Sequence, residues 1–179
     1  MNITENAEQQ NAQGPQQNEP IFSYNDVSKY RGVGGWLLLL CVGLTIIGPL
    51  MRLSGIGSTM AELPRISAVL PSLVTLIYVE NIFSLFITAF SVYAGYSLWA
   101  VKPNAVYKAK AFLITLVIFA VFDLFLIYMI ELPVAVANEA IAQGIFGLVQ
   151  SVLYAGVWFA YLTQSKRVRA TYGEPFGEF

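Results

Sequence analysis

The stretch KYRGVGGWLLLLCVGLTIIGPL, residues Lys29 to Leu50, places three glycines and a tryptophan directly before a long apolar run. Three further apolar runs follow, at about residues 72–101, 109–130 and 144–163. Roughly 20 apolar residues cross a bilayer as a helix, so each run is long enough for one span. We therefore predict an all-α integral membrane bundle of four transmembrane helices, the first at about residues 33–51.

The composition of the 179-residue chain agrees with this prediction, because 56% of the residues are hydrophobic and only 12% are charged. The formal net charge of -1 provides no concentrated basic surface, so nucleic acid is not an expected partner. Histidine is absent and Cys41 is the only cysteine. We therefore expect no metal site and no cofactor.

The chain divides into three segments. Residues 1–28 are rich in Gln and Asn, contain Pro15 and Pro20, and offer little apolar surface to bury, which predicts a disordered polar tail. Residues 29–172 form the expected four-span domain, and residues 173–179 form a short cytoplasmic tail.

The distribution of basic residues predicts the orientation. Arg52 and Arg65 lie on one side of the predicted spans, and eight basic residues lie on the other. By the positive-inside rule, both termini are then cytoplasmic. The eight residues are Lys29, Arg31, Lys102, Lys108, Lys110, Lys166, Arg167 and Arg169.

Gly34, Gly35 and Trp36 mark the point where the chain is expected to enter the membrane. A phosphate-binding glycine loop follows a strand and opens a helix of ordinary polarity, whereas here a polar tail precedes a run of membrane length. Glycines at this position let the chain turn into the bilayer and let another segment approach closely. The sequence therefore favours a membrane-insertion motif over a phosphate site.

Several short motifs are similar to those of a known family. They are the Gly-Gly-Trp-Leu segment at residues 34–37, the end of the second span at residues 99–103, and Ser-Lys-Arg-Val at residues 165–168, followed by Thr171 and Tyr172. Between about Tyr30 and Tyr172 the chain resembles the bacterial domain-of-unknown-function 2569 family of small four-helix inner-membrane proteins. The resemblance implies a fold and a location in the bacterial inner (cytoplasmic) membrane, and it implies no activity.

Glu80 and Asp123 lie inside predicted spans, where an ionised carboxylate costs at least about 2.5 kcal/mol. Counting about 1.5 Å per residue along each helix places both at a similar depth in the outer half of the bilayer. With Asn81 as a neighbouring hydrogen-bonding group, they form a candidate intramembrane polar site.

Three interpretations of this polar site stay open. The carboxyl groups can hydrogen-bond between helices, handle a proton or cation, or pair with a basic residue of a partner subunit. Because Arg52 falls after the first predicted span, we expect no Lys or Arg of this chain to neutralise the acids within the membrane.

Lys166, Arg167 and Arg169 follow the fourth predicted span. Basic residues at this position anchor any cytoplasmic helix end, and they also form a candidate docking patch for a partner or an anionic lipid headgroup.

The chain contains no recognisable nucleophile with an adjacent base, so we do not expect an enzyme. The favoured function is a non-enzymatic accessory or scaffold component of the cell envelope. The alternative is a small transporter or proton-coupled component that uses Glu80 and Asp123. The expected partners are the lipid bilayer and either another membrane protein or a second copy of this chain.

Overall fold

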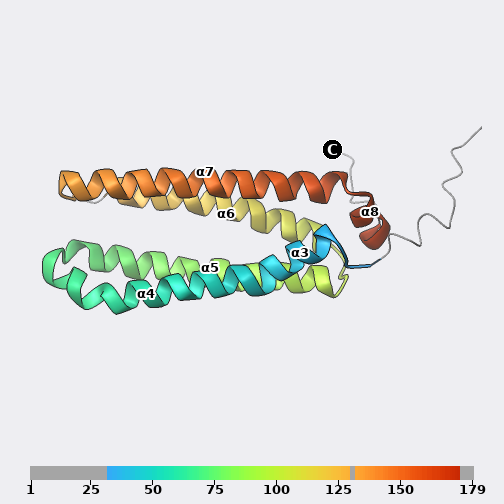
Figure 1. Cartoon of the computed structure of the whole chain (residues 1–179), viewed down its shortest axis with the longest axis horizontal. Coiled ribbons are helices and arrows are strands. Elements are labelled where there is room, and N and C mark those ends of the chain that lie inside the picture. Colours follow the sequence, from blue (N-terminus) through green and yellow to red (C-terminus); the bar gives the residue numbers. More distant parts are fainter. Residues whose placement is uncertain (1–31, 130–131, 174–179) are drawn as a thin grey trace, which may run out of the picture.

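The computed structural model describes residues 32–129 and 132–173, and every element in these ranges is a helix (Figure 1). Four continuous helices are long and apolar enough to cross a membrane, which confirms the predicted fold class and identifies a multi-pass membrane protein. The predicted tail at residues 1–28 lies outside the described residues, as do residues 174–179. The elements are α3 (Trp36–Val42), the π-helical segment η1 (Gly43–Ile47), α4 (Gly48–Val69), α5 (Ser72–Trp99), α6 (Ala105–Tyr128), α7 (Val134–Gln164) and α8 (Lys166–Tyr172).

The first long helix extends well beyond its predicted end. α3, η1 and α4 form one continuous helix of 34 residues, whereas hydropathy placed the end of the first span near Met51. Arg52 and the small residues after it lower the hydropathy without breaking the backbone. Even Pro64 is accommodated inside α4, where it is exposed. Similarly, α7 begins at Val134 and not near residue 144, because Asn138, Glu139 and Gln143 interrupt the apolar pattern of its first turns without ending the helix.

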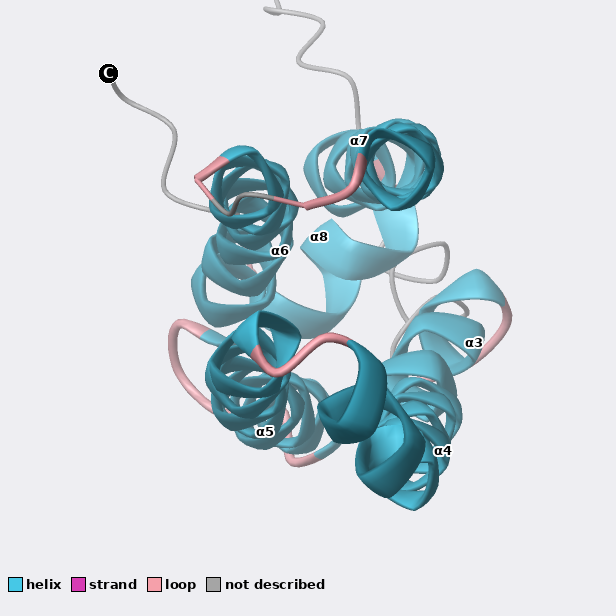
Figure 2. Ribbon diagram, turned by 90° about the vertical axis from the view of Figure 1, so that its left-hand side faces the viewer, coloured by secondary structure: helices cyan, strands magenta, loops and turns pink. Residues whose placement is uncertain are grey.

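The long helices form two antiparallel hairpins, α4 with α5 and α6 with α7, and α5 also packs against α6 (Figure 2). At one end, which carries α3 and α8, the hairpins lie close together. We call this the basic end because Lys102, Lys108, Lys110 and α8 lie there. Toward the α4–α5 and α6–α7 connections the hairpins separate, and we call that the open end (Figure 1).

The π-helical segment lies where the first helix meets α5. The hydroxyl of Ser91 on α5 donates a hydrogen bond of 2.7 Å to the carbonyl of Leu44 within η1. A Cβ atom at Gly95 would lie 2.5 Å from Cγ2 of Thr45, so only glycine permits this approach of α5. π-helical turns are often found at functional sites, and this one borders a cavity described below.

The apolar core is concentrated toward the basic end. Phe90 of α5 packs edge-on against Phe112 of α6, with ring centroids 5.7 Å apart. Val168 anchors α8 in the same cluster and is fully buried. The most deeply buried members, all at most 2% exposed, are Leu37, Leu40, Cys41, Leu44, Ala94, Leu98, Ala105, Ala109, Leu113, Leu162 and Val168.

Candidate functional site

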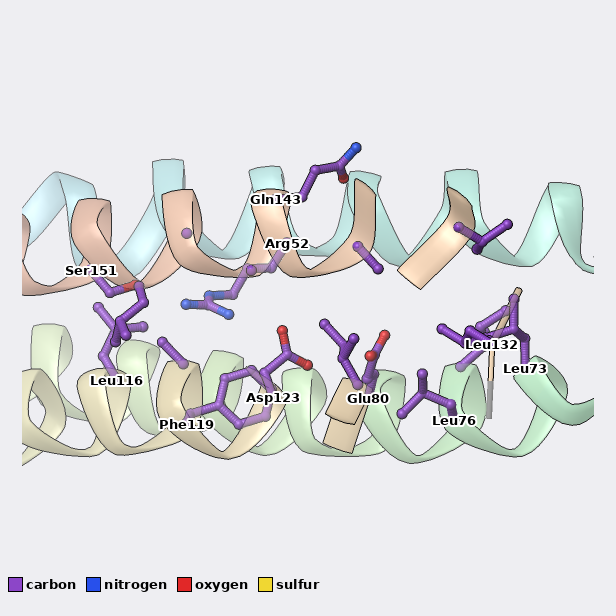
Figure 3. Close-up of a pocket in the computed structure, with 18 residues that line it drawn as sticks. Arg52, Leu73, Leu76, Glu80, Leu116, Phe119, Asp123, Leu132, Gln143 and Ser151 are labelled. Carbon is purple, nitrogen blue, oxygen red and sulfur yellow. The ribbon is translucent and has the colours of Figure 1, made fainter. Parts of the chain in front are cut away.

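A cavity of about 480 Å³ lies between the two hairpins in the half of the molecule nearer the open end. All four long helices contribute to its lining, which reaches Leu73 at the start of α5 and Leu132 just before α7. Its polar residues are Arg52 from α4, Glu80 from α5, Asp123 from α6, and Gln143 and Ser151 from α7 (Figure 3).

Glu80 and Asp123 lie on neighbouring helices, and both line the cavity. Their carboxyl groups lie close enough to interact with one another (Figure 3). Their similar depth, expected from counting residues along the helices, explains how α5 and α6 bring them together. Apolar side chains of the cavity, including Ile77, Phe119 and Ile127, surround them. Two ionised carboxylates repel one another in such surroundings, so a proton or cation between them is stabilising.

Arg52 extends from α4 into the same cavity (Figure 3). Arg52 thus lines the cavity of the two acids, but the described residues include no ion pair between it and either carboxyl group, so the expectation that no basic residue of this chain neutralises the acids stays a prediction. Arg52 reaches the cavity because it lies well inside a helix that continues to Val69, and not in the connection that hydropathy placed after Met51. Arg52 also lines an adjoining cavity of about 430 Å³ next to η1, together with Tyr154.

Asn81 is not among the residues that line the cavity with Glu80 and Asp123. Its side-chain Nδ2 is buried and has no hydrogen-bond partner among the described residues. Sequence reasoning also missed Gln143, which lies directly before the predicted fourth span and is placed on α7 only by the true start of that helix. The structure thus adds Arg52 to the cavity of the acid pair and leaves Asn81 apart from it. The Gln143 amide points away from the two acids and donates to Oε1 of Glu139 at 3.4 Å (Figure 3).

At the basic end, two of the three motifs that carried the family resemblance, at residues 34–37 and 165–168, contact one another. A Cβ atom at Gly34 would lie 2.7 Å from Nη1 of Arg167, so this glycine makes room for the guanidinium group. Gly35 has φ 59° and ψ -134°, a backbone conformation that residues with a Cβ rarely adopt. Trp36 is 70% exposed at the start of the first long helix. The segment therefore combines a turn with a close contact to α8.

The candidate docking patch lies on α8, a short helix that the sequence analysis did not predict. Ser165 caps this helix by accepting a hydrogen bond from the Val168 amide at 3.5 Å. Arg167 faces Gly34, whereas Lys166 and Arg169 are exposed. The three basic residues therefore do not share one surface, and their role in docking stays a prediction.

Hydrogen bonds fasten α8 to the rest of the basic end. The Gly32 amide donates to Oγ1 of Thr171 at 3.1 Å, and the hydroxyl of Tyr172 donates to the carbonyl of Leu98 at 2.7 Å. Burial raises the pKa of the Tyr172 hydroxyl above its usual value of 10.0, so this donor stays protonated at pH values where an exposed tyrosine loses its proton.

No curated protein and no solved structure matches this chain. One family model matches residues 30–173, which include every described residue, and its description is "Protein of unknown function (DUF2569)". The motifs at residues 34–37 and 165–168 both fall within the matched region. The chain therefore belongs to the domain-of-unknown-function 2569 family.

Proposed function

We propose that this protein is a small transporter or proton-coupled component of the bacterial inner membrane, in which Glu80 and Asp123 take up a proton or small cation. One observation carries the proposal: two acids and one arginine, from three different helices, line a single cavity. Acids within membrane spans are costly and usually mark ion or substrate pathways.

The size of the cavity favours this function over simple interhelical hydrogen bonding. A hydrogen bond that only joins α5 to α6 requires no empty space beside it. The volume of about 480 Å³ exceeds that of several water molecules, each of which occupies about 30 Å³ in the liquid. A hydrated ion or a small solute therefore fits next to the carboxyl groups.

The charges in the cavity suggest what is bound. Two ionised carboxylates and one guanidinium group leave a single negative charge, which one proton or one monovalent cation would neutralise. Arg52 also borders the adjoining cavity beside Tyr154, so its side chain has space on both sides. Movement of Arg52 toward or away from the acids would couple its position to cation uptake.

The positive-inside rule supports an outward-facing cavity. Lys102, Lys108, Lys110 and the basic residues of α8 lie at the opposite end of the molecule from Leu73 and Leu132. With the basic end in the cytoplasm, the cavity draws its ligand from the outer side of the membrane.

Reconstitution into liposomes tests the proposal. We expect Glu80→Gln and Asp123→Asn to abolish flux driven by a pH or cation gradient, because amides preserve shape but cannot titrate. Their effect on stability should be small, on the scale of the roughly 0.6 kcal/mol typical of interhelical hydrogen bonds. Glu62→Gln is the matched control, since Glu62 is exposed on α4 outside the cavity lining.

Three results separate the candidate functions. Loss of flux in the two amide variants with retained folding supports transport. Absence of flux in the wild-type protein, or equal flux in all variants, contradicts it. A stoichiometric partner recovered in mild detergent, whose binding does not depend on Glu80 or Asp123, would instead support the accessory or scaffold function that the sequence analysis favoured.

A further inference from the structure

A third cavity, of about 680 Å³, lies at the basic end between the α5–α6 connection and α8. It is separate from the acid-lined cavity and shares no lining residue with it. Its lining consists of residues 101–107, Lys110, Thr171 and Tyr172.

The charged residues of this lining are Lys102 and Lys110. The Thr171 and Tyr172 hydroxyls are already engaged, with Gly32 and with the Leu98 carbonyl. Lys102 and Lys110 are therefore the charged donors of the lining, beside the uncharged Asn104 amide and Tyr107 hydroxyl, and no acidic residue lines the cavity. The acidic residues that the structure describes, Glu62, Glu80, Asp123 and Glu139, lie on the membrane-spanning helices outside this cavity.

Aromatic rings hold both ammonium groups in place. Nζ of Lys102 lies 4.4 Å from the ring centroid of Tyr96, and Nζ of Lys110 lies 5.0 Å from that of Phe159. A cation over an aromatic face keeps N–H groups free to bind an anion on its other side. Both lysines thus line one cavity, and each ammonium group is positioned by an aromatic ring.

The location of the cavity indicates the source of that ligand. Residues 101–104 connect the ends of α5 and α6, directly beyond two membrane-spanning segments, which is the level of lipid headgroups. Val101 and Tyr107 are 45% and 74% exposed, so apolar surface flanks the charged groups. The headgroup of an anionic glycerolipid would contact the lysines, and its acyl chains would contact the flanking apolar surface.

We propose that this cavity binds the phosphate group of an anionic membrane lipid through Lys102 and Lys110. Basic pockets between membrane helices on the cytoplasmic side bind phosphate headgroups in other proteins. The proposal is independent of transport through the acid-lined cavity.

Lys108 provides a matched control on the same helix as Lys110. Its Nζ lies 4.9 Å from the ring centroid of Tyr93, a similar aromatic contact, yet Lys108 does not line the cavity. A diffuse attraction of basic residues to an anionic leaflet predicts equal effects at Lys108 and Lys110. A defined site predicts that substitution of Lys110 weakens lipid binding much more than substitution of Lys108.

The experiment titrates the detergent-solubilised full chain with phosphatidylglycerol and measures bound lipid by native mass spectrometry. At the energy typical of a lysine beside an anionic leaflet, Lys110→Gln should lower affinity about fivefold and the Lys102→Gln/Lys110→Gln pair about 25-fold. Lys108→Gln should change affinity less than about twofold, while Lys110→Arg retains binding. Thermal melting of each variant verifies folding.

Phosphatidylcholine and soluble glycerol phosphate identify the ligand source. We expect weaker retention of phosphatidylcholine and no competition from glycerol phosphate at concentrations matching the lipid. Equal losses in Lys108→Gln and Lys110→Gln, or equal binding of the two lipids, would overturn the proposed site. Full competition by glycerol phosphate would overturn the lipid source and indicate a soluble phosphate ester instead.

Discussion

The basic end and the open end use the same long helices but hold them together in different ways. At the basic end, side chains such as Leu37, Leu98 and Leu113 are at most 1% exposed, and α8 closes the bundle. Toward the open end, the hairpins flank a cavity that contains Arg52, Glu80 and Asp123. The apolar core thus lies toward one end of the bundle, whereas the two acids and Arg52 line a cavity between the hairpins toward the other.

This difference predicts an uneven distribution of stability. Regions with few buried apolar contacts open locally at lower free energy than a packed core. Substitutions at the basic end should therefore change global stability, whereas substitutions in the acid-lined cavity should change activity first.

The largest effect is expected from filling the contact between α5 and η1. Gly95→Leu should lower the free energy of unfolding by about 3 kcal/mol or more, because a Cβ atom there already lies 2.5 Å from Thr45 and 2.9 Å from Leu44. Gly147→Leu is the control, since a Cβ at Gly147 meets nothing within 4 Å. It should cost less than about 1 kcal/mol but reduce flux by filling the cavity. If thermal melting in detergent shows equal losses of stability for Gly95→Leu and Gly147→Leu, the two ends do not differ in packing as proposed.

An intermediate effect is expected at the turn before the first long helix. Gly35→Ala should cost about 2 kcal/mol, because its φ of 59° and ψ of -134° are strained for any residue with a Cβ. Gly34→Ala should cost less, because the atom in its way is the flexible end of Arg167. Chemical denaturation of both variants measures the two values. A greater cost at Gly34 would show that Arg167 is rigidly held.

A smaller effect is expected at Tyr172. Tyr172→Phe removes the 2.7 Å hydrogen bond to the Leu98 carbonyl and should cost about 1 kcal/mol at neutral pH. Burial raises the pKa of Tyr172, so above its ordinary value of 10.0 the unfolded chain loses the proton while the folded chain keeps it. Stability therefore falls as pH rises through about 10, and the advantage of tyrosine over phenylalanine should shrink. If the difference in stability between the wild type and Tyr172→Phe does not change with pH, Tyr172 is not a buried hydrogen-bond donor with a raised pKa.

The same contrast explains how much could be predicted from sequence. Span number and helical class follow from the lengths of the apolar runs, and the joint depth of Glu80 and Asp123 follows from helical rise. The sequence analysis placed Arg52 after the end of the first span because a charged residue lowers the local hydropathy. The helix nevertheless continues through Arg52 to Val69. The Gly34–Arg167 contact joins residues distant in sequence, so no local pattern could reveal it.

Thiol labelling in intact membranes tests whether the open end holds a water-filled, negatively charged cavity while the apolar core near the basic end excludes water. Cys41, fully buried at the basic end, is the internal control and should not react. Gly147→Cys places a thiol in the cavity, and the adjacent Phe146→Cys places one on a surface that is 72% exposed toward lipid. We expect a membrane-impermeant cationic reagent added from outside to label Gly147→Cys faster than an anionic reagent, with the preference lost in an Asp123→Asn background. Labelling of Gly147→Cys no faster than Phe146→Cys, or at equal rates with both reagents, would contradict a charged cavity open to the outside.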